Sequence, residues 1–254
     1  MLRFASLGSG SKGNGTLVEA NSTRVLIDCG FGLAETERRL ATLNCEPQSI
    51  AAILITHEHG DHAGGVGKLS RKYKIPVWST VGTYTACKDD RFASFHVICS
   101  ERSFAIKDVH INPFPVPHDA REPCQFTFSD GNSTMGLLTD VGDYTPHILN
   151  KISGVDALML ECNYDWGMLD AGKYPQSLKR RVSGRYGHLD NRQSQKILEF
   201  IDTSKLQYLI GMHLSENNNH EELAMEALCA GMKCKDERIF LANQESGFFW
   251  KKIQ

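Results

Sequence analysis

The sequence predicts an α/β fold of four layers, in which two mixed β-sheets pack face to face and helices cover their outer sides. Two observations support this prediction. Short strand-like segments fill the middle of the chain, from about residue 94 to 139, and helices alternate with strands on either side of it. Several predicted strands are apolar throughout rather than alternating, which is typical of strands that are covered on both faces. Because no low-complexity linker or short repeat interrupts the pattern, residues 1–254 are expected to form a single domain.

The first third of the chain is expected to begin with strands and to continue with alternating helices and strands. Apolar and β-branched residues bounded by Gly, Asn and Ser define the early strands. The predicted strands lie at 2–7, 15–19, 24–28, 51–56 and 76–79, and the predicted helices lie at 33–43, 65–74 and 81–88.

The remainder of the chain repeats this mixture of elements. The turn at residues 129–133, Ser-Asp-Gly-Asn-Ser, indicates a hairpin. Further strands are predicted at 109–117, 135–139, 156–161, 206–212, 238–241 and 248–251, and helices at 191–201 and 219–230. Residues 164–188 are rich in Gly, Tyr and Arg and lack apolar periodicity, so we predict a long functional loop there.

Composition bounds the class of protein. The chain has 254 residues, 41% of them hydrophobic, with 28 Lys and Arg against 30 Asp and Glu. This balance excludes wholesale disorder, and its net charge of −2 weighs, as a sum, against a nucleic-acid partner. The apolar runs are too short to span a bilayer, and the N-terminus lacks a secretory apolar region, so a cytoplasmic protein without a membrane partner is expected. The eight scattered cysteines are expected to be reduced thiols.

The most informative segment is residues 56–62, Thr-His-Glu-His-Gly-Asp-His, which follows the predicted strand 51–56. It places His57, His59, Asp61 and His62 within six residues at the end of a strand. Imidazole and carboxylate groups are ligands for Zn²⁺ and other first-row metals. A solvated polar turn is the alternative interpretation, but this density of ligands at a strand end favours a metal site.

Three later residues have the same placement. His118, Asp140 and His213 each follow a predicted strand. Taken singly, any of them could be an ordinary core or surface residue. Their common position at strand ends indicates that they join the first cluster at one edge of a sheet.

This pattern resembles the metallo-β-lactamase superfamily of dinuclear metallohydrolases, and residues 27–30, Ile-Asp-Cys-Gly, are similar to its first-strand aspartate motif. The resemblance covers essentially the whole chain and implies an αββα sandwich with two divalent metal ions, Zn²⁺ or Mn²⁺, with Fe²⁺ also compatible. It implies that His57, His59 and His118 hold one ion, that Asp61, His62 and His213 hold the other, that Asp140 bridges them, and that Asp28 orients the cluster without binding metal.

Other sequence features indicate which class of substrate the protein acts on. Only 72 residues separate Asp140 from His213, which leaves no space for the large inserted domain of the β-CASP nucleases. Residues 183–191 resemble the loop in which tRNase Z-type enzymes place a histidine that assists phosphate binding and leaving-group protonation, here His188. The glycine-rich residues 8–15 continue into a strand rather than a helix, which excludes a dinucleotide cofactor. That segment could offer backbone amides to a phosphate or simply connect a hairpin.

Charge is distributed unevenly along the chain. Residues 173–192 carry a net charge of +5, so the rest of the chain carries −7. The basic residues of this segment are Lys173, Lys179, Arg180, Arg181, Arg185 and Arg192, against the single acid Asp190. Local Lys and Arg clusters neutralise phosphates, although a solvated charged surface is the simpler interpretation of such a run.

Four segments look like the YycJ/WalJ group of this superfamily, which is associated with 5′→3′ exonuclease activity on double-stranded DNA and with DNA repair. These segments are residues 6–15, 161–165, 174–181 and 187–191. The chain departs from the group's pattern at Asp190, where the group has Ser.

The sequence therefore predicts a dinuclear, metal-dependent phosphodiesterase, and specifically a DNA exonuclease. Asp61 and Asp140 are expected to be catalytic, and His188 is expected to donate a proton to the leaving oxygen. The residues expected to bind substrate are Arg180, Arg181, Arg185, Lys12 and Asn163. Two alternatives remain open: a hydrolase of small esters or cyclic phosphodiesters, such as a lactonase or thioesterase, and a non-catalytic metalloprotein that binds nucleic acid.

Overall fold

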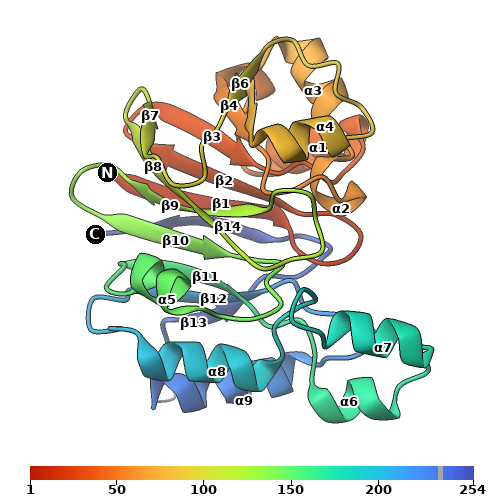
Figure 1. The fold of residues 1–254 in the computed structure, drawn as a ribbon. Helices are drawn as coiled ribbons and strands as arrows, with labels where there is room; N and C mark the ends of the chain where they lie inside the picture. The colour runs from red at the N-terminus through yellow and green to blue at the C-terminus, as the bar shows by residue number, and fades with distance from the viewer. Residues whose placement is uncertain (234–236) are drawn as a thin grey trace.

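The computed structural model describes residues 1–233 and 237–254, and within them it contains two seven-stranded β-sheets packed face to face (Figure 1). In spatial order, the strands of the first sheet are β14 (Phe248–Lys252), β1 (Leu2–Gly8), β2 (Gly15–Ala20), β3 (Thr23–Ile27), β4 (Ile50–Leu54), β5 (Val77–Ser79) and β6 (Phe95–Val97). Strands β14 to β3 are antiparallel neighbours, and β3 to β6 are parallel.

The second sheet is likewise divided into a parallel part and an antiparallel part. Its strands are β13 (Ile239–Leu241), β12 (Tyr208–Met212), β11 (Ala157–Glu161), β10 (Thr134–Leu138), β9 (Cys124–Ser129), β8 (Val109–Pro115) and β7 (Phe104–Ile106). Strands β10 to β13 are parallel, whereas β7 to β10 are antiparallel.

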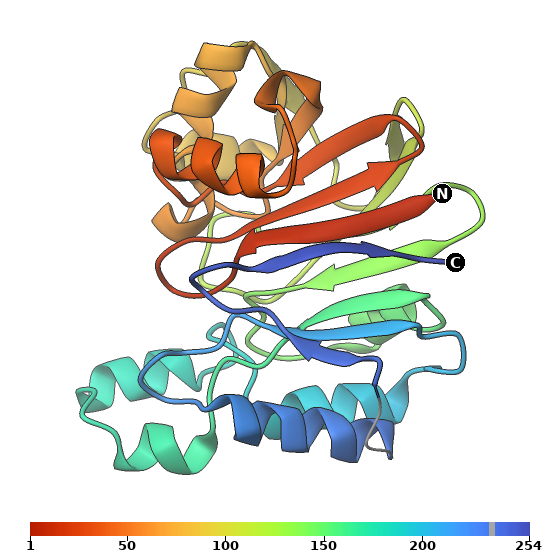
Figure 2. The ribbon, with the colours of Figure 1, turned by 180° about the vertical axis from the view of Figure 1, so that it is seen from behind.

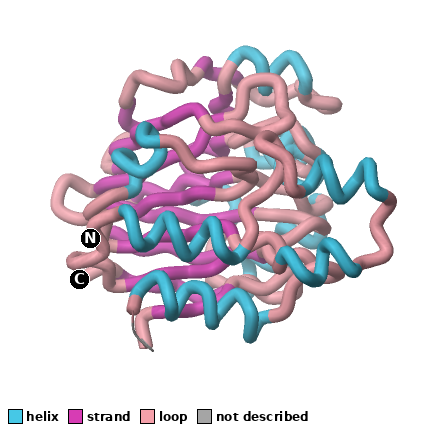
Figure 3. The backbone as a smooth tube through the Cα atoms, turned by 60° about the horizontal axis from the view of Figure 1, so that its bottom comes forward, coloured by secondary structure: helices cyan, strands magenta, loops and turns pink. Residues whose placement is uncertain are grey.

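Helices form the outer layers, as the sequence predicts. Those that follow the strands of the first sheet are α1 (Leu33–Thr42), the 3-10 turn η1 (Pro47–Ser49), α2 (Gly60–Ala63), α3 (Val66–Tyr73) and α4 (Val81–Ala86). Those of the second half are α5 (Pro146–Ile152), α6 (Trp166–Ala171), α7 (Gln176–Val182), α8 (Asn191–Phe200) and α9 (Glu221–Met232). Helices α8 and α9 lie side by side across the second sheet, as Figure 3 shows.

Three hydrophobic cores separate these layers. A central core lies between the sheets, and one further core lies under the helices on each outer side. Adjacent residues of one strand therefore enter different cores: Leu26 of β3 packs in the outer core and Ile27 in the central one. This double burial explains why the predicted strands are apolar throughout, and it confirms the predicted four-layer arrangement.

The parallel strands place their carboxyl ends at a common edge of the sandwich. Ligand sites of α/β sheets form at such an edge, because the loops that follow parallel strands gather there. In this structure β3, β4, β10, β11 and β12 all end in that region. Helices α6 and α7 project beside this edge, and the two chain termini lie at the opposite end of the strands (Figure 2).

The segment 164–188 differs from the prediction of a long loop, because it contains the short helices α6 and α7. These helices have only six and seven residues, too few to show a helical period in the sequence. Local chemistry defines them instead. The Asp165 carboxylate accepts a hydrogen bond from the Met168 amide at the start of α6, and Pro175 precedes the first residue of α7.

A second difference concerns helix α9, which continues two residues beyond the predicted end. Gly231 lies within its last turn, and Lys233, with a left-handed backbone, ends it.

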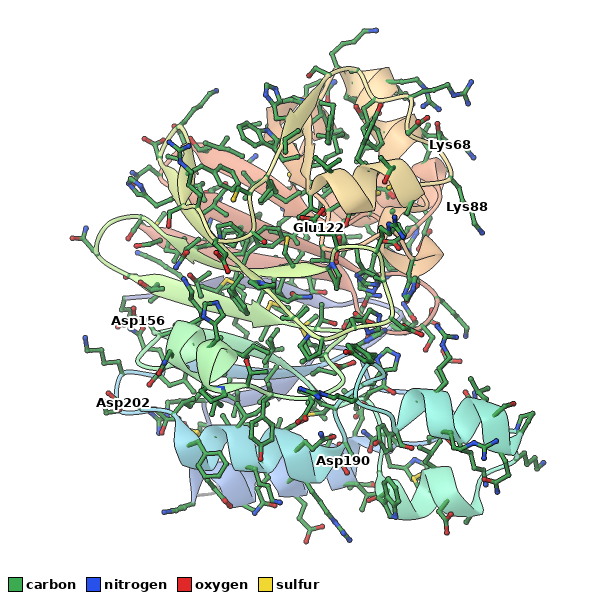
Figure 4. The ribbon with its side chains drawn as sticks, in the orientation of Figure 1. Lys68, Lys88, Glu122, Asp156, Asp190 and Asp202 are labelled. Atoms are coloured by element: carbon green, nitrogen blue, oxygen red, sulfur yellow. The ribbon has the colours of Figure 1, made fainter. Side chains whose placement is uncertain are left out.

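Asp190, the departure from the YycJ/WalJ pattern, has a structural role. Its carboxylate accepts a hydrogen bond from the Gln193 amide at 2.6 Å, and the Gln193 side chain accepts one from the Asp190 amide at 3.0 Å. Figure 4 labels Asp190 at the beginning of α8. Ser and Asp are both favourable at this helix position, so the exchange preserves the cap.

The seven cysteines within the described residues are free thiols, and Cys234 lies outside those residues. Burial raises the pKa of the Cys29 thiol to about 12. Among the described helices, we find none whose length and hydropathy would let it cross a membrane.

Candidate metal centre

The histidine-rich turn follows β4 and continues into helix α2, where the chain passes very close to the end of β3. A Cβ atom at Gly30 would lie 1.8 Å from the backbone oxygen of Asp61, so only glycine permits this approach. Two backbone hydrogen bonds fix the turn further. The Cys29 amide donates to the His62 oxygen at 2.7 Å, and the Asn14 amide donates to the Asp61 oxygen at 2.8 Å.

Three residues of the candidate site have a left-handed backbone conformation. Asp28, Asp140 and His213 follow β3, β10 and β12, and their φ angles are 59°, 54° and 55°. Such angles are uncommon outside glycine, although Asp tolerates them better than most residues. Conformations of this kind cost about 1–3 kcal/mol each and cluster at functional sites.

The sequence-predicted ligands come together in two groups at this edge. The first ligand group is His57, His59 and His118, and the second ligand group is Asp61, His62 and His213. Within each group, one potential ligand atom per residue lies within 4.8 Å of the others.

Asp140 lies between the two ligand groups. One of its carboxylate oxygens is 3.0 Å from Nε2 of His62, and the other is 3.8 Å from Nε2 of His118. It thus contacts a member of each group, which is the position expected of a bridging ligand.

Each histidine of the two groups has one ring nitrogen held by the protein, which orients the ring so that the other nitrogen can bind a metal ion. The holding atoms are Thr56 Oγ1 for His57 (2.9 Å), the Asp119 backbone oxygen for His59 (3.3 Å), Asp28 Oδ2 for His62 (2.8 Å), the Gly187 backbone oxygen for His118 (3.0 Å) and Glu161 Oε1 for His213 (3.2 Å). Nε2 of His62 also lies 3.0 Å from Nδ2 of Asn14.

Asp28 orients histidines of the site without belonging to either ligand group. It accepts hydrogen bonds from the Thr56 amide at 2.9 Å and from the Thr56 hydroxyl at 2.8 Å, besides its contact with His62. The same hydroxyl contacts Nδ1 of His57, so one buried carboxylate orients a histidine of each ligand group.

The donor set fits divalent cations. The Nε2 atoms of His57 and His213 are buried without a hydrogen-bond partner among the described residues. A buried polar nitrogen without a partner is costly, and a metal ion in each ligand group would satisfy one of these two atoms. Imidazole nitrogens and carboxylate oxygens in this proportion suit Zn²⁺ and also admit Mn²⁺ or Fe²⁺.

The electrostatics differ between the two groups. Burial lowers the pKa of His62, but the carboxylates of Asp140 and Asp28 outweigh burial and raise the pKa well above its usual value. For His213 burial also lowers the pKa, and carboxylates led by Asp140 raise it to about 10. In the first group, burial dominates and lowers the pKa of both buried histidines.

Sequence reasoning missed one site residue, Glu161. It is fully buried at the end of β11, and its Oε1 lies 2.8 Å from Nδ1 of His188, while its Oε2 accepts a hydrogen bond from the Val141 amide at 2.8 Å. Burial lowers the pKa of His188, but Glu161 more than compensates and raises it. An acid at the end of an apolar strand was the available signal, since Asp28 and Asp140 have the same placement.

A cavity of about 310 Å³, here called the active-site cavity, opens onto both ligand groups. His188, Arg181 and Asn163 also line it. Nε of Arg181 forms an ion pair with Asp119 at 2.6 Å. The Asn163 side chain donates a hydrogen bond to the His213 backbone oxygen at 2.8 Å, so it also fixes the end of β12.

The other predicted substrate-binding residues do not line this cavity. Arg180 faces a separate cavity between α6 and α7, together with Trp166. Arg185 is exposed on the loop after α7. Lys12 is exposed and forms an ion pair with Glu216 at 2.7 Å.

The glycine-rich segment 8–15 connects two antiparallel strands, β1 and β2. Its amides mostly have protein partners: the Gly10 amide donates to Asn14 Oδ1 at 2.9 Å and the Lys12 amide to Gln244 Oε1 at 2.7 Å. The Ser9 hydroxyl accepts a hydrogen bond from the His213 amide at 2.8 Å. The segment is therefore a structural connection that supports His213, and these amides are not available to a phosphate.

Comparisons with known proteins identify the family and two similar proteins. A family model described as a beta-lactamase superfamily domain matches residues 23–214. The chain is 33% identical over 231 residues to the exodeoxyribonuclease YycJ of Bacillus anthracis, covering 88% of this chain and 86% of that protein. It is 31% identical over 229 residues to the exodeoxyribonuclease WalJ of Streptococcus pneumoniae, covering 87% and 85%.

Among solved structures, zinc-bound PqqB of Methylobacterium extorquens has the same fold. The TM-score is 0.77 at 15% sequence identity, over 98% of this chain and 99% of that one.

Metal binding should depend on pH differently at the two ligand groups. In the metal-free protein His62 and His213 carry protons at neutral pH, because their pKa values are raised, and a metal ion must displace those protons. The affinity for the Zn²⁺ ion bound at the second ligand group should therefore fall as pH falls from 8 to 6. The affinity for the ion bound at the first ligand group should change less. Calorimetric titration of metal-stripped protein in this range measures both.

His213→Gln serves as the control for that titration. It should remove the equivalent that is more sensitive to pH and leave the other. Two equivalents with identical pH dependence in the unmodified protein would contradict the assignment.

Proposed function

We propose that this chain, which belongs to the beta-lactamase superfamily and is a metal-dependent hydrolase, cleaves phosphodiester bonds. The proposed activity is that of a 5′→3′ exonuclease on double-stranded DNA. The family membership agrees with the resemblance inferred from the motifs. Both curated relatives described above are named exodeoxyribonucleases, and they match this chain over most of its length. A role in DNA repair is part of the same proposal.

The observation that carries the proposal is the pairing of His188 with Glu161 beside the two ligand groups. A protonated imidazole is needed where the leaving group is a poor one, such as the 3′ oxygen of a nucleotide. The Glu161 contact occupies Nδ1 of His188, so its Nε2 remains to face a substrate in the active-site cavity. Lactones and thioesters have less need of such a donor.

Each group in the cavity then has a defined task. When bound, the metal ions would supply Lewis acidity toward the phosphate and lower the pKa of a water molecule. Asp140 holds the two ligand groups together, and Asp61 completes the second. The attacking water loses one proton to solvent, and its oxygen bonds to phosphorus as the bond to the 3′ oxygen breaks. His188 transfers its proton from Nε2 to the departing oxygen and regains a proton from solvent. Arg181 neutralises a phosphate oxygen near the mouth of the cavity.

The direct test is digestion of end-labelled DNA and RNA, single-stranded and double-stranded, with Zn²⁺ or Mn²⁺ restored after chelation. We expect the 5′ label of duplex DNA to be released first, and Asp61→Ala to abolish release. Failure to digest any nucleic acid, whatever its ends, would overturn the proposal. Salt-insensitive turnover of a small ester instead would identify a small-molecule hydrolase, and DNA binding that survives chelation without cleavage would identify a binding protein.

His188→Ala should lower kcat on DNA by about 10²–10⁴-fold, the usual contribution of a positioned acid. The matched control is the substrate bis(p-nitrophenyl) phosphate, whose leaving group departs without protonation. The variant should retain most of its activity on this substrate. Equal losses on both substrates would mean that His188 does not act as the proton donor.

Arg181→Ala should raise the KM for DNA several-fold. Because one phosphate contact is lost, the slope of log(kcat/KM) against log salt concentration should flatten by about 0.9. Arg180→Ala is the matched control: it removes the same charge from the adjacent position, but Arg180 lies outside the active-site cavity. Similar slopes for the two variants would indicate a general effect of charge rather than a specific contact.

A further inference from the structure

A second cavity adjoins the active-site cavity. It has a volume of about 430 Å³ and lies at the end of α6, between that helix and the loop that follows His213. The two cavities share Tyr174 and Asn218. The remaining residues of the second cavity are Met168, Ala171, Gly172, Lys173 and Asn217.

The aromatic ring at the boundary is held in place. Tyr174 is half-buried, and its hydroxyl accepts a hydrogen bond from Nδ2 of Asn217 at 3.3 Å. Its backbone is restricted as well, because the residue before a proline, here Pro175, is confined to extended conformations. A flat apolar surface therefore borders both cavities.

An amide side chain lies beside this ring. Asn218 is 2% exposed, and its backbone oxygen accepts a hydrogen bond from the Asp165 amide at 2.8 Å. Its side-chain Oδ1 approaches α6 closely, since a Cβ atom on Gly172 would lie 2.9 Å from it. Nδ2 donates to Ser215 Oγ at 3.3 Å, so one N–H donor and the Oδ1 acceptor remain at a position that the fold defines.

The charges of the two cavities differ. The active-site cavity contains Arg181 and the candidate metal ligands, which suit a phosphate. The second cavity has Lys173 as its one charged lining residue within the described part of the chain, and its polar groups are otherwise neutral. A planar heteroaromatic ring that stacks and forms hydrogen bonds matches this surface better than a second phosphate does.

We propose that the second cavity binds the base of a nucleotide that carries the scissile phosphate, with the base stacked on Tyr174 and its edge facing Asn218. This inference rests on the proposed function. It has a mechanical consequence, because a base in this cavity cannot remain paired in a duplex, so the enzyme must open the terminal base pair. Neutral stacking is tolerant of sequence, so bases of all four kinds should be accepted.

The test is calorimetric binding of deoxyadenosine 3′-monophosphate, deoxyadenosine 5′-monophosphate and inorganic phosphate to the metal-loaded protein. At least one nucleotide should bind about tenfold more tightly than phosphate, as expected for one stacked base. The isomer that gains affinity identifies which side of the scissile phosphate carries the bound base. If neither nucleotide binds more tightly than phosphate, the proposal is wrong.

Two variants make the test specific. Tyr174→Ala should abolish the advantage of the nucleotide over phosphate, and Tyr174→Phe should keep most of it, because the ring remains. Zn²⁺ binding by the metal-stripped proteins should be the same in all three, which checks folding and metal loading, and each nucleotide affinity is compared with the phosphate affinity of the same protein. An undiminished nucleotide advantage in Tyr174→Ala overturns the proposal.

These measurements are independent of DNA digestion. If the protein binds nucleotides more tightly than phosphate through Tyr174 but digests no nucleic acid, the base-binding proposal stands and the proposed function is wrong. If the protein digests DNA but Tyr174 contributes nothing to nucleotide affinity, the proposed function stands and the base-binding proposal is wrong.

Discussion

The site depends on pairing buried carboxylates with buried imidazoles at the ends of parallel strands. Asp28, Asp140 and Glu161 are at most 2% exposed, and each contacts at least one histidine. Removing one partner of such a buried pair typically costs about 3–5 kcal/mol, because the other charge is left uncompensated. The acids and histidines therefore hold one another in position, and they fix together the strand ends that carry them.

The same pairing connects the sandwich to the segment that projects from it. Glu161 contacts His188 through one carboxylate oxygen and receives the Val141 amide on the other. The backbone oxygen of Gly187, next to His188, orients His118 at 3.0 Å. The loop after α7 thus holds both the proposed proton donor and a ligand of the first group. Displacement of this loop would disturb acid catalysis and metal binding together, which makes its attachment to β11 a condition for both.

The fold and the convergence of the candidate ligands could be predicted because strand ends impose strong local patterns. Continuous apolar runs predicted the strands, and the density of His and Asp after β4 indicated the metal site. Glu161 was missed although it follows the same pattern, because the signal was a single acid at a strand end, which resembles a surface residue until its partner His188 is seen. Arg180 and Arg181 are adjacent in sequence, yet they face different cavities. A charge count cannot separate them, because the direction of a side chain depends on the rotation of a helix too short to show a period.

The net charge of the segment 173–192 does not show which of its basic side chains can contact a substrate. The placement of each side chain decides this. Within the described residues, Arg181 is the one Lys or Arg side chain of the segment 173–192 that lines the active-site cavity. Its partner Asp119 is part of an exposed ion pair, and such pairs contribute only about 0–1 kcal/mol, so a phosphate can displace that carboxylate at low cost. Within the cavity, a single guanidinium supplies only a small part of the electrostatic attraction for a DNA end. Under the proposed function, most of the binding energy must come from the metal centre and from contacts with the nucleotide itself. That division of labour suits an enzyme that acts at strand ends, because neutral contacts with an accessible terminal base favour an end over the continuous charged backbone.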